Sequence, residues 1–258
     1  MPDHPPLLQT AIQAARAAEE VIKHYYRSDL GVRLKADQSP VTVADIETEQ
    51  AIRQVLQQAF PGYGFYGEET GKNRADAEHV WLVDPIDGTK SFIRGYPFFS
   101  TQIALMRGNE LILGVSNAPL FNELAYAEIG RGAFLNGESL QVSDIGTLDA
   151  ATLSFGNLKT LAGEHRWSGI GELIRQCNRT RGYGDFYHYH LLAAGKLDIV
   201  IESDINILDV AALSVIIREA GGQVTDLAGQ PLSLETKTIL ASNGLLHDTV
   251  LQRLGAKQ

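Results

Sequence analysis

The sequence predicts a layered α/β sandwich whose first half is of α+β type. Two N-terminal segments carry apolar residues at helical spacing, and residues 79–142 then change to short segments rich in β-formers. From about residue 151, strand-like and helix-like segments alternate. Such alternation is typical of helices layered on a sheet.

The two N-terminal helices are predicted first. Residues 7–26 repeat apolar side chains every three or four positions, which indicates a helix with one buried face. A second helix is predicted from Thr42 to Phe60, where Thr42 and Asp45 form a capping arrangement. Pro61-Gly62 ends it, because neither residue sustains a helix.

Strands dominate the next region. Short β-rich runs lie at residues 79–83, 100–106, 111–116 and 124–128. Asn136-Gly137 is a strong hairpin signal, since both residues tolerate the positive φ that a tight turn requires.

The second half alternates strands with helices. Strands are expected at 151–155, 180–184, 197–202 and 237–241, and helices at 167–177, 185–195 and 207–220. The stretch 143–150 is the expected boundary between an N-terminal subdomain, residues 1–145, and a C-terminal subdomain, residues 146–258.

Composition limits the possible partners. Of 258 residues 44% are hydrophobic, enough for a sizeable core, and the net charge of −9 disfavours a nucleic-acid binder. The single cysteine, Cys177, excludes an intrachain disulfide and favours a reducing compartment. No signal peptide and no run of about 18 apolar residues is present, so we expect a cytoplasmic protein that does not bind membranes.

The segment Asp84-Pro85-Ile86-Asp87-Gly88-Thr89 follows the apolar run 80–83. A buried strand is thus predicted to end in two aspartates, a glycine that allows a turn and a threonine that can hold a water. Clusters of acidic oxygens bind Mg²⁺, which prefers carboxylates together with retained waters.

Further acids lie at the ends of other predicted elements. Asp45 falls in the first turn of the second helix, Glu68 and Glu69 follow the Gly-rich stretch 62–67, and Asp209 opens the helix at 207–220. Taken alone, each acid also suits an ordinary structural role. Asp45 and Asp209 suit a helix cap, Glu68-Glu69 suits a solvated loop, and the Asp84–Asp87 segment suits a turn before a helix.

Together the acids form a recognisable series. In chain order the motifs are Thr-Val-Ala-Asp at 42–45, Gly-Glu-Glu-Thr at 67–70, Asp-Pro-Ile-Asp-Gly-Thr at 84–89, and an acid opening an Ala-Ala-containing helix. Over residues 7–250 the chain resembles the inositol monophosphatase superfamily of Mg²⁺-dependent phosphomonoesterases. The resemblance implies an αβαβα sandwich of the sugar phosphatase type, two or three Mg²⁺ ions per site and a homodimer.

The resemblance also implies roles for individual residues. Glu68 would bind the activating metal and orient a water, Asp84 would bridge two metals, and Ile86 would offer its backbone carbonyl. Asp87 and Asp209 would complete the second metal site, with Glu69 behind these ligands. Thr89 and Asp45 would hydrogen-bond the attacking water, and the N–H groups of Gly88 and Thr89 would meet the phosphate. Lys35 would lie in a loop that closes over the third metal.

The chemistry is consistent with these residue types. A dianionic ester repels hydroxide, and Mg²⁺ ions offset that repulsion, acidify a bound water and stabilise the leaving oxygen. Haloacid-dehalogenase-type phosphatases use two aspartates separated by one residue, whereas two residues separate Asp84 from Asp87. The Walker phosphate-binding loop is absent. A metal- or phosphate-binding regulatory module is the non-enzymatic alternative, although such a module would be expected to have lost a metal carboxylate.

Three local features resemble the histidinol-phosphatase branch of this superfamily. They are Lys90-Ser91-Phe92-Ile93-Arg94-Gly95, the segment Arg181-Gly182-Tyr183-Gly184-Asp185, and Leu208 where inositol-specific members place Trp. Histidinol phosphate carries an ammonium group and an imidazole, for which Asp185, Glu202 and Asp204 offer anionic partners. An inositol-1-phosphate phosphatase, or a broader sugar or nucleotide phosphatase, is the alternative.

Remaining candidates have weaker signals. Lys90 and Arg94 are placed to approach the phosphate, although a surface cation is the alternative for Arg94, while Asp185 also suits a helix N-cap. His188 and His190 should face different ways on their helix and are interpreted as packing or surface residues, and Cys177 as a packing residue.

Overall fold

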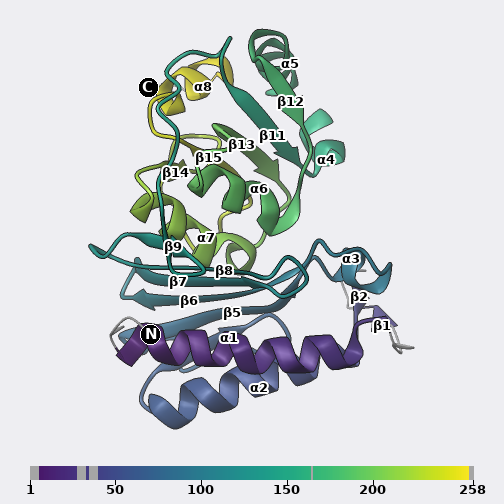
Figure 1. Cartoon of the computed structure of the whole chain (residues 1–258), viewed down its shortest axis with the longest axis vertical. Coiled ribbons are helices and arrows are strands. Elements are labelled where there is room, and N and C mark those ends of the chain that lie inside the picture. Colours follow the sequence, from purple (N-terminus) through teal and green to yellow (C-terminus); the bar gives the residue numbers. More distant parts are fainter. Residues whose placement is uncertain (1–5, 28–32, 35–39, 164, 256–258) are drawn as a thin grey trace.

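The computed structural model describes residues 6–27, 33–34, 40–163 and 165–255, and these stack into five layers (Figure 1). The first layer consists of α1 (Pro6–Tyr25) and α2 (Val43–Ala59), which lie on one face of a large sheet. A middle helical layer separates this sheet from a smaller one, and further helices cover the smaller sheet. The predicted αβαβα sandwich is therefore confirmed.

The large sheet has eight strands in the order β10-β9-β8-β7-β6-β5-β3-β4. Its strands are β3 (Gly64–Gly67), β4 (Gly71–Asn73), β5 (His79–Asp87), β6 (Ser100–Arg107), β7 (Glu110–Ala118), β8 (Glu123–Glu128), β9 (Ala133–Leu135) and β10 (Glu138–Leu140). All neighbours are antiparallel except β3 and β5, which run parallel. The hairpin predicted at Asn136-Gly137 joins β9 to β10, and both residues have positive φ.

The middle layer contains α6 (Asp185–Ala193) and α7 (Ile207–Glu219). Almost all of α7 is buried, because it packs on the large sheet on one side and beneath the small sheet on the other. This double burial explains why its sequence is apolar all round rather than amphipathic.

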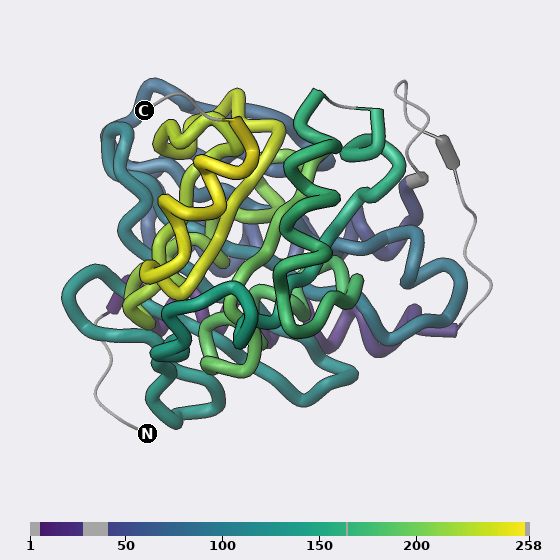
Figure 2. The backbone as a smooth tube through the Cα atoms, turned by 90° about the horizontal axis from the view of Figure 1, so that it is seen from above, coloured from purple at the N-terminus to yellow at the C-terminus, as the bar shows by residue number. Residues whose placement is uncertain are grey.

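The small sheet has five strands in the order β12-β11-β13-β15-β14. They are β11 (Thr152–Gly156), β12 (Arg179–Arg181), β13 (Ile199–Ser203), β14 (Gln223–Thr225) and β15 (Thr238–Ser242). Its outer face carries α4 (Leu158–Ala162), α5 (Trp167–Gln176) and α8 (His247–Arg253). Figure 2 shows α5 in green and α8 in yellow side by side on this face.

Three short elements complete the described chain. Strands β1 (Arg33–Leu34) and β2 (Pro40–Val41) pair with each other, and α3 (Thr89–Ile93) follows β5. No helix in the described ranges combines the length and apolar character that crossing a membrane requires.

The core between the two sheets draws on both halves of the chain. It joins strand residues such as Leu82 and Ala125 to α7 residues such as Leu213. The division into subdomains at residue 145 stays a prediction.

Several elements differ from the predicted ones. Strand β5 continues through Asp84 to Asp87, whereas the sequence suggested an end at Val83. The Gly-rich stretch contains β3, and β12 ends at Arg181 rather than Gly184. These strands are recognisable only from their partners, since glycines and a three-residue run give little β signal. The short elements β4, β14, α4 and α8 were not predicted.

Candidate active site

The Asp84–Asp87 segment owes its geometry to a bulge in β5. Asp84 is paired with Gln102 of β6 and Asp87 with Ser100, so three steps along β5 match two along β6. In a regular strand, residues an odd number apart face opposite sides of the sheet. The extra residue at Pro85-Ile86 removes that alternation, so both carboxylates reach the same site.

The parallel pairing of β3 with β5 places Glu68 beside Asp84. Gly67 is opposite Val83 in the register, and the Glu68 N–H donates to the Val83 carbonyl at 3.1 Å. Glu68 follows Gly67 and Asp84 follows Val83, so the two acids lie next to each other. Glu68 lies close enough to raise the pKa of Asp84 by repulsion and by a side-chain hydrogen bond.

Asp209 comes from the first turn of α7, two residues after the helix begins at Ile207. Its Oδ2 accepts the Asn206 N–H at 2.8 Å, which completes a capping box at this helix N-terminus. Asp209 therefore caps this helix and also belongs to the acidic cluster. Asp84, Asp87 and Asp209 each offer one carboxylate oxygen, and these three oxygens lie within 4.8 Å of one another.

The electrostatics of this cluster are those of mutually repelling anions. Burial, followed by repulsion from Glu68, Asp87 and Asp209, raises the pKa of Asp84 well above its usual range. Burial and repulsion from Asp209 do the same to the pKa of Asp87. Burial also raises the pKa of Asp209 to about 7, although the Asn206 N–H opposes the shift. A hard cation held by these oxygens would offset both the cost of burying their charges and their mutual repulsion.

Thr89 connects the cluster to α2. Its Oγ1 lies 3.2 Å from Asp45 Oδ1 and 3.0 Å from the Ile86 carbonyl. Asp45 Oδ2 accepts from the Thr42 N–H and the Thr42 hydroxyl, each at 2.7 Å, so the predicted cap is present and the second oxygen is left for Thr89. Burial raises the pKa of Asp45 despite these hydrogen bonds.

Gly88 makes the turn from β5 into α3. Its φ is 88°, a left-handed conformation that favours glycine, and a Cβ here would lie 2.6 Å from the Phe98 carbonyl. Any side chain at this position would therefore disturb the turn between Asp87 and Thr89.

Glu49 is a buried acid that the sequence reading missed. Its carboxylate accepts the Glu69 N–H at 2.7 Å and the Thr70 N–H at 3.0 Å, and it also accepts the Thr70 hydroxyl. It thereby fixes the turn that carries Glu68 and Glu69. The signal was available, because Glu49 lies four residues after Asp45 on the same helix face.

A second group of acids adjoins the cluster. Asp87, Asp185, Glu202 and Asp209 all line one small pocket of about 80 Å³, which also has Asn157, Tyr189, Ile205 and Val210 in its wall. Burial and the charge of Glu202 raise the pKa of Asp185 to about 6, while His188, Ser91 and Lys90 oppose the rise. The structure thus brings Asp185 and Glu202 next to the candidate metal ligands.

The other predicted residues are placed less closely. Lys90 is exposed on α3 but near enough to influence Asp185, and Arg94 is exposed at the C-terminal end of α3. Asp204 is exposed beyond β13. Asp185 is the first residue of α6 and Gly184 is the N-cap, so the N-cap interpretation of Asp185 is wrong. Lys35 lies outside the described residues.

His188 and His190 are both buried, which confirms packing and excludes a surface position. They face opposite sheets, as expected from their spacing. His190 reaches Ser116 and Glu123 in the large sheet, each at 2.8 Å. His188 reaches Ser154 and Glu202 in the small sheet, each at 3.2 Å. The latter contact was missed, although His188 lies three residues after Asp185 on one helix face. Cys177 is buried at the end of α5, as expected.

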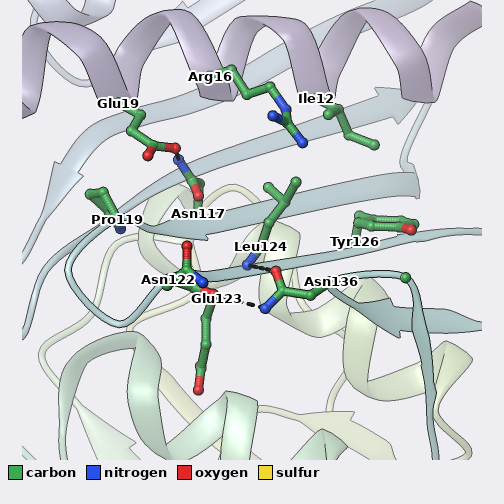
Figure 3. Close-up of a pocket in the computed structure, with 11 residues that line it drawn as sticks. Ile12, Arg16, Glu19, Asn117, Pro119, Asn122, Glu123, Leu124, Tyr126 and Asn136 are labelled. Atoms are coloured by element: carbon green, nitrogen blue, oxygen red, sulfur yellow. Dashed lines mark hydrogen bonds between the residues drawn. The ribbon is translucent and has the colours of Figure 1, made fainter. Parts of the chain in front are cut away.

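A larger pocket, of about 360 Å³, lies between α1 and strands β7 and β8, and none of the residues that line it is a predicted site residue (Figure 3). Many of its polar side chains are already paired with protein groups. Glu19 pairs with Lys23 and Asn117, and Asn136 bonds the Leu124 N–H and the Asn122 carbonyl. Glu123 accepts from His190. The acidic pocket is therefore the stronger candidate for chemistry, although it is smaller.

Comparison with known proteins agrees with this assignment. A profile of the inositol monophosphatase family matches residues 3–258. The chain is 39% identical over 261 residues to a histidinol-phosphatase of Mycobacterium tuberculosis, covering 98% of this chain and 99% of the relative. It is 37% identical to an inositol-1-monophosphatase of Caulobacter vibrioides, covering 95% and 99%. The crystal structure of the extragenic suppressor protein suhB from Bartonella henselae superposes with a TM-score of 0.88 at 31% identity, covering 97% and 98%.

Proposed function

The chain belongs to the inositol monophosphatase family, and we propose that it is a Mg²⁺-dependent phosphomonoesterase that hydrolyses L-histidinol phosphate to L-histidinol and phosphate. Its place would then be in histidine biosynthesis. The observation that carries the proposal is the pocket shared by Asp87, Asp209, Asp185 and Glu202, in which candidate metal ligands adjoin an anionic wall.

The donor set suits Mg²⁺. We propose that Asp84, Asp87 and Asp209 hold the ions together with Glu68 and the Ile86 carbonyl, because hard oxygen donors converge here and their charges repel one another. Bound Mg²⁺, two or three ions per site, would neutralise the ester and lower the pKa of a water. Glu69, whose N–H donates to Glu49, would adjoin these ligands without binding a metal itself.

Thr89 and Asp45 would orient the attacking water. The Thr89 hydroxyl has a single proton, which it can donate to Asp45 Oδ1 or to the Ile86 carbonyl. Either donation leaves the Oγ1 lone pairs free to accept a hydrogen bond from water. Asp45 itself is held by Thr42, so the pair is positioned before any substrate arrives.

The phosphate would be met by groups that follow β5. We propose the N–H groups of Gly88 and Thr89 and the cations of Lys90 and Arg94, which all lie in or beside α3. These cations suit the phosphate end of a zwitterionic ester, and the acidic wall suits its cationic end.

The cationic end of histidinol phosphate suits that wall. Asp185 and Glu202 lie beyond the metal ligands in the same pocket, and a charged hydrogen bond to an ammonium or imidazolium group is about twice as strong as a neutral one. Inositol phosphate offers only hydroxyls to these carboxylates. This difference favours the cationic ester over inositol 1-phosphate or a broader range of sugar and nucleotide esters.

Relatives named for both activities exist, so the substrate requires a direct test. We would measure kcat/KM for L-histidinol phosphate, inositol 1-phosphate and adenosine bisphosphate with the same preparation in Mg²⁺. The proposal expects histidinol phosphate to be preferred by at least about tenfold, the equivalent of about 1.4 kcal/mol. A tenfold preference for inositol phosphate would overturn it, and no hydrolysis of any ester would favour a regulatory module.

We also expect a homodimer in the cytoplasm. Light scattering on the purified protein tests the first point, since a dimer has twice the 28.1 kDa of one chain. A monomer at assay concentrations would contradict the expectation. Fractionation of the source cells tests the second.

A further inference from the structure

Glu202 is surrounded by hydrogen-bond donors of the protein. Its Oε2 accepts from the Tyr189 hydroxyl at 2.7 Å and lies 3.2 Å from His188 Nε2, and its Oε1 lies 3.5 Å from Asn157 Nδ2. The Asn157 amide is itself held by the Ser203 carbonyl at 2.7 Å. Because these contacts reach both carboxylate oxygens, they hold the buried carboxylate in one orientation in the pocket wall.

The backbone of β11 leaves room for this carboxylate. Gly156 is opposite Glu202 in the parallel register, so a side chain at either position projects from the same face of the sheet. A Cβ at Gly156 would lie only 1.9 Å from Glu202 Oε1. Glu202 thus extends over Gly156 of the neighbouring strand β11. It occupies space that a residue with a Cβ at position 156 would fill.

His188 occupies the position between Glu202 and Ser154. The Tyr183 N–H donates to Ser154 Oγ at 3.2 Å, so the hydroxyl proton of Ser154 is free to be donated to His188 Nδ1, 3.2 Å away. His188 then carries its own proton on Nε2 and donates it to Glu202 Oε2. The network assigns this tautomer, since a carboxylate oxygen only accepts, so that Nε2 carries the proton toward Glu202 and Nδ1 is left to accept from Ser154.

We propose that His188 is a positioning residue for substrate selection, acting through Glu202, with Ser154 setting its tautomer. The Ser154–His188–Glu202 chain runs from β11 through α6 to β13 and holds an anionic oxygen toward the pocket that Asp87, Asp185 and Asp209 also line. This inference rests on the proposed function, in that Glu202 faces the cationic end of the ester. His188 itself would contact neither the ester nor the proposed metal ligands.

The first test replaces the histidine in two ways. His188→Leu removes the donor to Glu202, and we expect KM for histidinol phosphate to rise about tenfold, the loss of one hydrogen bond to a charged group. Neither its kcat nor kcat/KM for inositol 1-phosphate should change by more than about threefold. His188→Gln retains an N–H donor, and should restore KM to within about threefold of wild type.

His190→Leu is the matched control. His190 lies on the same helix, is equally buried and loses two hydrogen bonds, but those are to Ser116 and Glu123 on the far side. Thermal unfolding should show both leucine variants folded with lowered midpoints. Only His188→Leu should change the ratio of kcat/KM between the two esters. If both variants changed that ratio equally, the effect would be structural and the inference would be overturned.

A double-variant cycle tests the route through Glu202 on whichever ester the enzyme hydrolyses best. We expect Glu202→Gln to raise KM, and His188→Leu added to it to change KM by less than about twofold, because the group it positions is already altered. Additive effects, or no effect of Glu202→Gln on any ester, would overturn the inference. Failure of wild type to prefer histidinol phosphate would instead overturn the proposed function, and the cycle would still report on His188.

Discussion

Two groups of acids adjoin one pocket, and the protein compensates their charges in different ways. At the first, Asp84, Asp87 and Asp209 face one another, and the main compensation is a backbone N–H to each of Asp84 and Asp209. At the second, Glu202 Oε2 accepts from the Tyr189 hydroxyl and lies 3.2 Å from His188 Nε2, and its Oε1 lies 3.5 Å from Asn157 Nδ2. We propose that an external cation neutralises the first group, whereas Glu202 in the second group is bonded to donors of the protein.

On the proposed function, this difference separates the acids that bind metal from the acid that selects the substrate. Carboxylates that repel one another bind Mg²⁺ strongly because the ion relieves repulsion that already exists. A carboxylate already bonded to three donors has less to gain from a metal. These bonds hold it in one orientation before any substrate arrives, as a selective wall requires.

The largest effect is expected at the unsatisfied group. Asp87→Asn should lower kcat/KM by on the order of 10³-fold, because metal binding contributes several kcal/mol to the transition state. The same change should raise the unfolding temperature of the metal-free protein, since one repelling charge is gone. Asp149→Asn, at an exposed acid, is the control and should change neither quantity. Retention of a tenth of the wild-type activity by Asp87→Asn would contradict the metal assignment.

Thr89→Val should reduce kcat by about 10²-fold, the usual contribution of a group that orients a proton transfer. The concentration of Mg²⁺ required for half activation should change little, because Thr89 is not one of the proposed metal ligands. Thr101→Val is matched, since Thr101 Oγ1 donates to the Pro85 carbonyl at 2.9 Å in the same bulge. Thr101→Val should lower the free energy of unfolding and leave kcat within about threefold of the wild-type value. Equal losses of kcat in both variants would indicate damage to the bulge.

Asp185→Asn should affect selection more than chemistry. We expect kcat/KM for histidinol phosphate to fall about tenfold and that for inositol 1-phosphate less than about threefold, because only the cationic ester loses an ionic partner. Steady-state kinetics with both esters measure the ratio. Equal losses would remove Asp185 from the cationic subsite.

The smallest effect concerns stability of the metal-free protein. The pKa of Asp209 is raised from 3.8 to about 7, so between these values the folded state binds more protons than the unfolded state. The free energy of unfolding must then fall as pH rises through this window. In EDTA we expect the unfolding temperature to drop by several degrees between pH 5 and pH 8. The stabilisation by added Mg²⁺ should be larger at pH 8, and a metal-free protein more stable at pH 8 than at pH 5 would contradict the account.

The sequence predicted the layers and most of the acids for local reasons. Helices at residues 7–26 and 42–60 follow from apolar spacing and a capping residue, and the acids at 45, 68, 84, 87 and 209 follow from their positions at element ends. Both are properties of short segments, which a sequence displays directly.

What the sequence did not predict depends on pairing between segments. The bulge at Pro85-Ile86 exists only relative to β6, and the position of Glu68 beside Asp84 only relative to the parallel partner β3. The Ser154–His188–Glu202 chain joins residues 34 and 14 positions apart through three elements. Glu49 and His188 nevertheless lay one helical turn from recognised acids, and that spacing was a usable signal.

The most direct measurement is phosphate release from L-histidinol phosphate by the metal-stripped protein before and after Mg²⁺ is added back. We predict no release above background in EDTA and full recovery with Mg²⁺, at a rate that Asp209→Asn lowers on the order of 10³-fold. Undiminished hydrolysis by the stripped protein would contradict the central claim that the unsatisfied acids act through a bound cation.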